Sequence, residues 1–308
     1  MRPTMSLILF AAFSVIFITG MPLKAQEMPG DYQQVLTSLN KKGDYKANVL
    51  KVNIPRNDLH VTVAGVATPT PFGFGGWIAM TKGDGGMDVM MGDLVLTEDE
   101  VNPVMSALLD NGLEVTALHN HFFWESPRIF YMHVHGHGKA TDLASKVKPA
   151  LDLIGKVGPG GNATGSQPVA TAGKLDTAAL DKVVGHTGEL NGAVYKYTVG
   201  RDDLAMKEIG ATINARMGLN TWAAFYGTDA QAVVAGDVAM TENEVTPVLK
   251  ALRANGLDVM AIHHHMIGSR PTVIFLHYWG KGPATKLAAG FKAALNELGK
   301  HGGAAHAH

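Results

Sequence analysis

The sequence predicts an α+β protein of two tandem duplicated units, each a mostly antiparallel sheet with helices packed on it. Three observations predict this fold class. The chain repeats itself over most of its length, short alternating segments lie between glycines and prolines, and the same helix-start signal occurs in both copies. The units span residues 30–156 and 175–300, and a linker rich in glycine and proline, 157–174, separates them.

The internal repeat is read from matching residues at a nearly constant offset. Arg56-Asn-Asp-Leu59 matches Arg201-Asp-Asp-Leu204 at an offset of 145 residues. One residue is then lost, and the offset stays at 144 to the end of the repeat. Chance does not produce an alignment this long, so the two units are expected to share one fold. The matches at 144 include His119 with His263, His121 with His265 and His133 with His277.

The first half of a unit predicts one helix and then strands. An amphipathic pattern favours a helix over residues 31–41. Strand-like segments follow, with glycines and prolines between them. These segments cover 47–53, 60–64, 77–81 and 88–96.

The second half of a unit begins at a clear helix start. Thr97 followed by Glu100 is a capping box, and Asn111-Gly112 marks the helix end. Two strands, 113–122 and 128–137, and a last helix over 140–154 are expected next. The second unit repeats this pattern, with a capping box at Thr241 and Glu244.

Composition excludes several classes of protein. Hydrophobic residues make up 46% of the 308, which is too many for a disordered chain. The net charge of −1 gives no basic excess, so nucleic acid is not an expected partner. The chain has no cysteine, which excludes disulfides, zinc–thiolate sites and iron–sulfur sites.

The N-terminus predicts export. Arg2 is followed by an almost wholly apolar run from Ser6 to Met21 and by Lys24-Ala25, which is typical of a signal peptide over residues 1–25. A retained anchor is the alternative. No later segment is apolar enough to span a bilayer, so we expect a periplasmic or secreted protein without stable membrane insertion after cleavage.

Histidine placement supplies the candidate site. Of the 14 histidines, 12 lie in three groups, the last of them in the tail 301–308. Residues two apart on a strand share a face, so we expect His119 and His121 to point the same way and His133 to return beside them. Imidazole nitrogens suit a divalent ion, with zinc first and iron, manganese, nickel or copper as alternatives. The predicted metal ligands are His119, His121, His133 and Glu125, and in the second unit His263, His265 and His277.

Two residues near the histidines are candidates for catalysis. Glu125 is predicted to act as a fourth ligand or general base, and Arg128 to hold an anionic substrate. Together with a metal-bound water they would perform hydrolysis, although whether the protein is an enzyme, and on which small molecule, stays open. Asp93 and Asp237 are alternatives for orienting an imidazole, or they belong to turns.

Three alternatives remain beside the hydrolase. The chain could be a non-catalytic metal-binding or metal-buffering module, the histidine face could hold a ligand without a metal, or the alternating histidines could form a solvated face. The second unit departs from the first at four positions. Ser269 replaces Glu125, Thr272 replaces Arg128, Trp279 replaces His135 and Lys281 replaces His137. This unit is therefore expected to keep the fold and lose part of the chemistry.

The segment His119-Asn-His121-Phe-Phe-Trp-Glu125-Ser-Pro-Arg128-Ile-Phe-Tyr-Met-His133, with the duplicated Glu-Val-x-Pro-Val helix before it, resembles the LppY/LpqO family of exported bacterial proteins. The resemblance covers the whole mature chain as two tandem copies. It implies export and no particular activity, because the family is functionally uncharacterised. Its namesakes are described as lipoproteins, a feature that does not carry over to a chain without cysteine.

Overall fold

A computed structural model describes residues 26–156 and 173–300. The predicted signal peptide, most of the linker and the histidine-containing tail lie outside these residues. Within the described part of the chain, no helix is long and apolar enough to cross a membrane.

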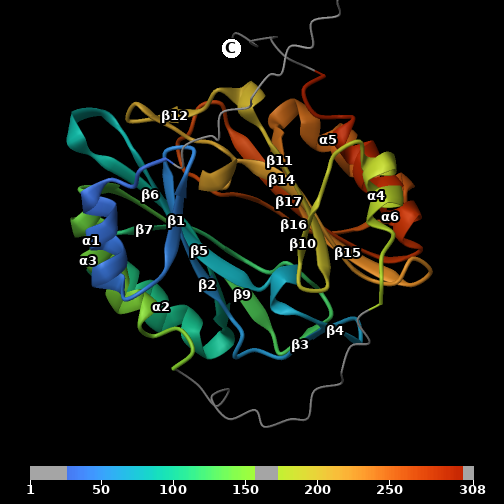
Figure 1. The fold of residues 1–308 in the computed structure, drawn as a ribbon, viewed down its shortest axis with the longest axis horizontal. Helices are drawn as coiled ribbons and strands as arrows, with labels where there is room; N and C mark the ends of the chain where they lie inside the picture. The colour runs from blue at the N-terminus through green and yellow to red at the C-terminus, as the bar shows by residue number, and fades with distance from the viewer. Residues whose placement is uncertain (1–25, 157–172, 301–308) are drawn as a thin grey trace, which may run out of the picture.

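The predicted fold class is confirmed, because each unit is a six-stranded antiparallel sheet with helices on one face (Figure 1). In the first unit the strand order is β1-β2-β5-β6-β9-β7, and in the second it is β10-β11-β14-β15-β17-β16. The two orders are equivalent strand by strand, as duplication requires.

The bounds of the elements follow the chain. The first unit contains α1 (Gly30–Leu39), β1 (Gly43–Lys46), β2 (Val49–Pro55), β3 (Val61–Val63), β4 (Val66–Thr68), β5 (Gly75–Lys82), β6 (Asp88–Thr97), α2 (Glu98–Asp110), β7 (Glu114–His119), β8 (Glu125–Ser126), β9 (Ile129–Gly138) and α3 (Ala140–Leu151). The second unit contains α4 (Thr177–Val184), β10 (Glu189–Asn191), β11 (Val194–Gly200), β12 (Lys207–Glu208), β13 (Ala211–Thr212), β14 (Asn220–Gly227), β15 (Ala232–Thr241), α5 (Glu242–Ala254), β16 (Asp258–His264), β17 (Val273–Gly282) and α6 (Ala284–Leu295).

Local signals set the helix starts. Both predicted capping boxes are present: the Thr97 hydroxyl accepts from the third helical amide and Glu100 accepts from the Thr97 amide, and Thr241 and Glu244 do the same. Each box satisfies two amide donors that an α-helix leaves without a partner at its N-terminus.

The two units pack with their sheets facing each other and their helices outside. Figure 1 shows α1, α2 and α3 on one side of the molecule and α4, α5 and α6 on the other, with both sheets between them. Each unit has its own core between sheet and helices. Two further apolar clusters mix residues of both units and join the inner faces of the sheets: one contains Phe72, Phe122 and Trp279, and the other contains Met91, Met217 and Phe275.

One predicted strand is shorter than expected. The segment 113–122 was predicted as a strand, but β7 ends at His119. The Asn120 amide group turns back to donate a hydrogen bond to the Ile129 carbonyl (2.7 Å), and Phe122 enters the apolar cluster between the sheets. His121 therefore lies beyond the strand, so the expected strand face shared with His119 is not formed.

Candidate metal centre

The first unit brings two histidines into contact. His119 ends β7, and His133 lies on the neighbouring strand β9, where it faces Ala117 across the ladder. Their Nε2 atoms are 3.0 Å apart. Sequence reasoning predicted that His133 would return beside His119, and the strand register gives the reason.

The second unit repeats this pair. His263 on β16 and His277 on β17 have Nε2 atoms 2.9 Å apart, and Ala261 faces His277 in the ladder. The same strands, in the same register, thus present a second imidazole pair.

The two pairs meet between the sheets. The His119 and His263 ring centroids are only 3.6 Å apart, and the His119 and His277 centroids are 5.1 Å apart. Four imidazoles from two units therefore form one cluster. The strand pattern predicted the face on which each histidine lies, but not that these faces pack against each other.

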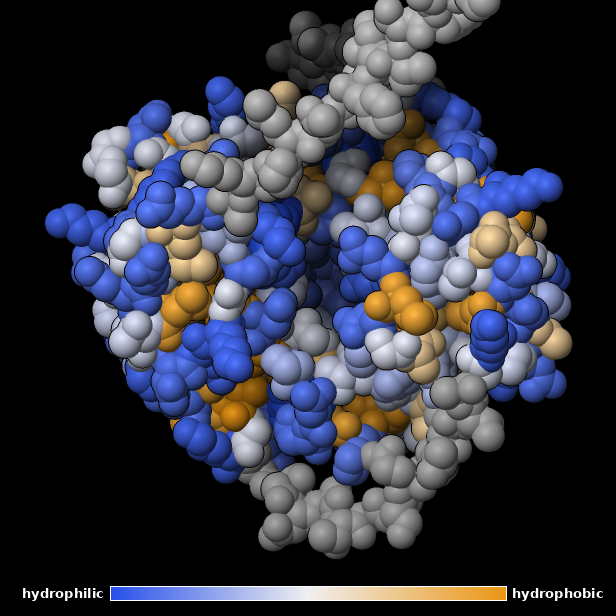
Figure 2. Space-filling model, in the orientation of Figure 1, coloured by the Kyte–Doolittle hydropathy of each residue, from blue (hydrophilic) through white to orange (hydrophobic). Residues whose placement is uncertain are grey.

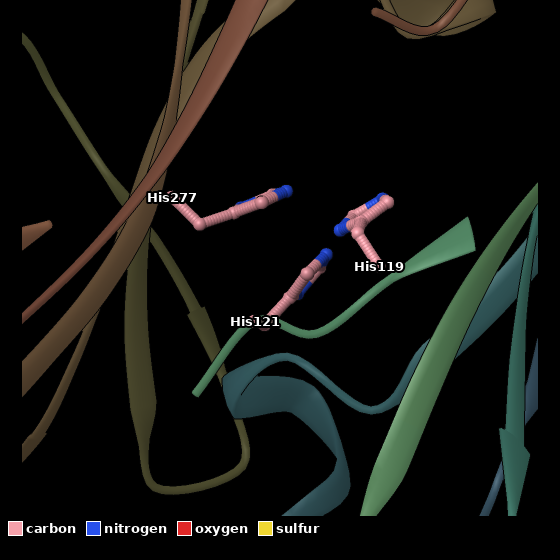
Figure 3. Close-up of side chains that lie close together, drawn as sticks. All are labelled: His119, His121 and His277. Atoms are coloured by element: carbon pink, nitrogen blue, oxygen red, sulfur yellow. The ribbon is translucent and has the colours of Figure 1, made fainter. Parts of the chain in front are cut away.

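Two more histidines cross from one unit to the other. The His121 ring lies between Tyr131 of its own unit and His277, with centroid distances of 3.2 and 3.6 Å. His265 makes the equivalent contacts with Phe275 (3.3 Å) and His133 (3.9 Å). In Figure 3 the ring nitrogens of His119, His121 and His277 point toward one another.

Burial keeps all six imidazoles neutral at neutral pH. Loss of water, with repulsion from His263, lowers the pKa of His119 to about 3, and burial lowers the pKa of His263 to about 4. The pKa values of the other four also lie well below the ordinary value, for the same two reasons. Neutral imidazole is the form that binds metal ions, so no proton has to leave first.

Several buried atoms in this layer lack a hydrogen-bond partner within the described residues. They are both ring nitrogens of His121, Nδ1 of His119 and of His277, Nε2 of His265, and one carboxylate oxygen each of Asp93 and Asp237. A buried polar atom without a partner costs roughly 1–3 kcal/mol. Ordered water or a bound ion would supply the missing contacts.

Two aspartates lie beside the histidines and two lysines interact with these aspartates, all at equivalent positions of the units. Asp237 is 3.8 Å from His265 Nε2 and 3.9 Å from His277 Nδ1, and Asp93 lies opposite His133 in its sheet. Burial raises the pKa of Asp93 to about 7, and burial also lowers the pKa values of Lys51 and Lys196 to about 8.

The lysines stand over tryptophan rings. Lys51 Nζ is 4.2 Å from the ring centre of Trp77, and Lys196 Nζ is 4.2 Å from that of Trp222. Sequence analysis missed both lysines, although their common offset of 145 residues was a signal that could have identified them. Figure 2 shows a hydrophilic hollow between the two halves of the molecule, on the face viewed there.

The donor set fits a divalent transition metal. The ligand atoms of His119, His121 and His277 all lie within 4.8 Å of one another, and so do those of His119, His133 and His263. Two nitrogens bound to one ion, each about 2.1 Å from it, lie about 3.0 Å apart at the right angle of an octahedral site and about 3.4 Å apart at the tetrahedral angle that zinc usually takes. The Nε2 separations of 3.0 and 2.9 Å match the first spacing, and each is also the length of an N–H···N hydrogen bond between neutral rings.

The structure does not bring Glu125 into either histidine group. Its carboxylate accepts hydrogen bonds from the Ile129 amide (3.0 Å) and the Asn120 side chain (3.4 Å), which fix it at the turn. Burial, only partly offset by these bonds, raises the pKa of Glu125 to about 7. Arg128 is exposed. The predicted ligand or base and the predicted anion holder thus stand apart from the imidazoles.

The sequence comparison identifies the family of both units. The family described as Domain of Unknown Function (DUF1259) matches residues 33–153 and again 178–297. The chain belongs to this family. The two matches confirm the internal duplication, while the resemblance to LppY/LpqO proteins stays a prediction. No curated protein matches the chain.

Solved structures give only weak likenesses. A trimeric bacterial microcompartment shell protein, PduB, is 14% identical, with a TM-score of 0.21 over 84% of this chain and 93% of that one. EtuB from Clostridium kluyveri is 11% identical, with a TM-score of 0.21 over 84% of this chain and 91% of that one. Such low TM-scores carry no argument about this protein.

Proposed function

We propose that this chain is an exported protein that binds a divalent transition metal between its two units, through imidazoles of both. The observation that carries the proposal is the meeting of His119, His133, His263 and His277, whose Nε2 atoms pair at 3.0 and 2.9 Å. His121 and His265 complete the cluster from the two loops that follow β7 and β16.

The choice of metal follows from the donor atoms. Six neutral imidazoles, with carboxylates behind them and no thiolate, suit zinc first and also copper(II), nickel(II), iron(II) or manganese(II). Calcium and magnesium prefer oxygen ligands and are disfavoured. Asp237, nearly 4 Å from two of the rings, is placed to orient them rather than to bind the ion itself.

The structure supports a wider site than the sequence predicted. The expectation was a complete site in the first unit, made of His119, His121, His133 and Glu125, and a degenerate one in the second. In the proposal both units share one centre, and Glu125 is not a ligand. Each group of mutually close ligand atoms holds three histidines, which would leave a coordination position open. A fourth imidazole of the cluster would close the site and favour binding or buffering of the metal over catalysis.

A second candidate function is metal-assisted hydrolysis. It is favoured by the buried carboxyl groups of Asp93 and Asp237 beside the rings and by the hydrophilic hollow between the units. In this version a carboxyl of the pair, rather than Glu125, would accept the proton of a metal-bound water. Hydrolysis of p-nitrophenyl acetate by the zinc-loaded chain, lost in Asp93→Asn with the ion retained, would favour it.

The metal content of the untagged chain tests the binding proposal. The protein is purified from the exported fraction, dialysed and measured by elemental analysis beside the double variant His119→Ala/His263→Ala. We expect the wild-type chain to carry a transition metal and the double variant to carry less of it per chain, by the ion of the central cluster. His264→Ala is the matched control, because His264 is exposed and belongs to neither group. A double variant with unchanged metal content would overturn the proposal.

A further inference from the structure

A second group of polar side chains lies where the end of β9 meets a hairpin of the other unit. His135 and His137 follow His133 on the same face of β9, and Glu208 on β12 reaches them from the second unit. The β12–β13 hairpin is held against the first unit by a hydrogen bond from the Asp84 amide to the Ile209 carbonyl, 2.7 Å long. Both units therefore build this cluster.

One carboxylate oxygen serves both rings. Glu208 Oε1 is 2.7 Å from His135 Nε2 and 2.5 Å from His137 Nε2. The ligand atoms of the three residues all lie within 4.8 Å of one another. Two imidazoles and one carboxylate form a donor set that catalytic zinc and non-haem iron(II) sites use.

Glu114 fixes the orientation of His135. Its Oε2 lies 3.3 Å from His135 Nδ1, on the side of the ring away from Glu208. A carboxylate that accepts the N–H of one ring nitrogen leaves the other nitrogen free as a ligand. This arrangement directs His135 Nε2 toward the position shared with His137 and Glu208.

The cluster is not a relic of duplication. At the equivalent positions the second unit has Trp279 and Lys281, and Trp279 packs edge-on against Phe72 and Phe122, with both ring centroids at 5.8 Å. The equivalent end of the interface is thus apolar. Val63, not an acid, stands at the position equivalent to Glu208. Polar residues from both units therefore face each other at only one of these two equivalent ends of the interface.

An ion pair alone explains this geometry less well. His135 Nε2 is buried and makes no aligned hydrogen bond among the described residues, although Glu208 Oε1 is close to it. A cation between the three groups satisfies the two nitrogens and the carboxylate together.

We propose that His135, His137 and Glu208 form a second divalent transition-metal site, separate from the central six-histidine cluster. The side chains of His137 and Glu208 are 29% and 24% exposed, so water or a small ligand can reach the ion. Three protein ligands leave coordination positions open. The ion would also tie the β12–β13 hairpin to β9 and so hold the two units together at this edge.

Zinc titration of the untagged, metal-free chain by calorimetry tests this site. We expect wild-type protein to bind one more zinc ion than Glu208→Gln or His137→Gln. Glu114→Gln should keep the ion with roughly 10–100-fold weaker affinity, since the orienting carboxylate is lost. The exposed His264→Gln is the matched control and should titrate like the wild type.

Two variants distinguish zinc binding at Glu208 from zinc binding at the central six-histidine cluster. The double variant His119→Ala/His263→Ala should still bind the ion at Glu208, whatever happens at the centre. His137 is partly exposed, so His137→Gln provides a folded variant, checked by circular dichroism, if Glu208→Gln does not fold. If both single variants bind zinc with the number and affinity of the wild type, the cluster is an ion pair only and the inference is wrong.

Discussion

Replacing one histidine of the second unit should remove the stabilisation that a metal ion shared with the first unit gives to the fold. His277 pairs with His263 at 2.9 Å and stacks on His121 at 3.6 Å, so His277→Ala takes a ligand from the centre of the cluster. A metal ion at a free concentration 100 times its Kd stabilises the folded chain by about 2.7 kcal/mol. At about 2–4 °C per kcal/mol for chains of this size, the wild-type Tm should rise by roughly 5–11 °C.

Thermal unfolding with and without zinc measures this effect. Each variant is compared with its own metal-free form, so the cavity left by the missing ring does not enter the difference. His277→Ala should lose the part of the zinc-induced rise in Tm that the central cluster supplies and keep any part due to the ion at Glu208, while His264→Ala keeps the whole rise. An undiminished rise in His277→Ala would refute the idea that the second unit supplies ligands to a shared ion.

Two further predictions concern stability. Burial alone would raise the pKa of Glu244, but Arg201 and the amides of Gly299 and Thr241 lower it below the value in the unfolded chain. The ionised Glu244 therefore stabilises the fold fully above about pH 4.3, the pKa of an unfolded glutamate. This stabilisation is lost as the pH falls through the lower pKa of the folded state. Glu244→Gln should therefore cost about 3–5 kcal/mol at pH 7 and flatten the acid limb of a urea-unfolding series; an unchanged acid limb would contradict this assignment. Trp279→Ala should lower the free energy of unfolding by about 3–5 kcal/mol, because Trp279 fills the apolar end of the interface, and a loss below about 1 kcal/mol would show that the end is not packed.

Local sequence signals predicted much of each unit. The capping boxes at Thr97 and Thr241 predicted the starts of α2 and α5, and the alternating segment 88–96 predicted β6 within one residue. These features depend on neighbours in the chain, which a sequence shows directly. The strand β1 was missed because Gly43-Asp-Tyr-Lys46 has no clear alternation.

The shared centre could not be predicted in the same way. The period of a strand indicates which residues share a face, but not what that face packs against. The His119 and His277 rings, from different sheets, come within 5.1 Å of each other only because the units pack sheet to sheet. The alternative of a solvated face is wrong, since His121, His133 and His277 are at most 5% exposed.

The candidate catalytic residues show the same limit. Spacing alone placed Glu125 beside the histidines, but the turn directs its carboxylate to the Ile129 amide. No sequence pattern linked Glu208 to the histidines of the first unit, because it lies some 70 residues further along the chain. It reaches them only because it lies on the β12–β13 hairpin of the other unit. Contacts between units therefore required the structure.

A crystal structure of the zinc-soaked chain, with anomalous data at the zinc edge, decides whether the two units share one metal ion. We expect an anomalous peak between the two sheets, with Nε2 atoms of both units, from His119 or His133 and from His263 or His277, about 2.1 Å from the ion. Zinc bound by histidines of one unit alone, or no peak between the sheets, would contradict it.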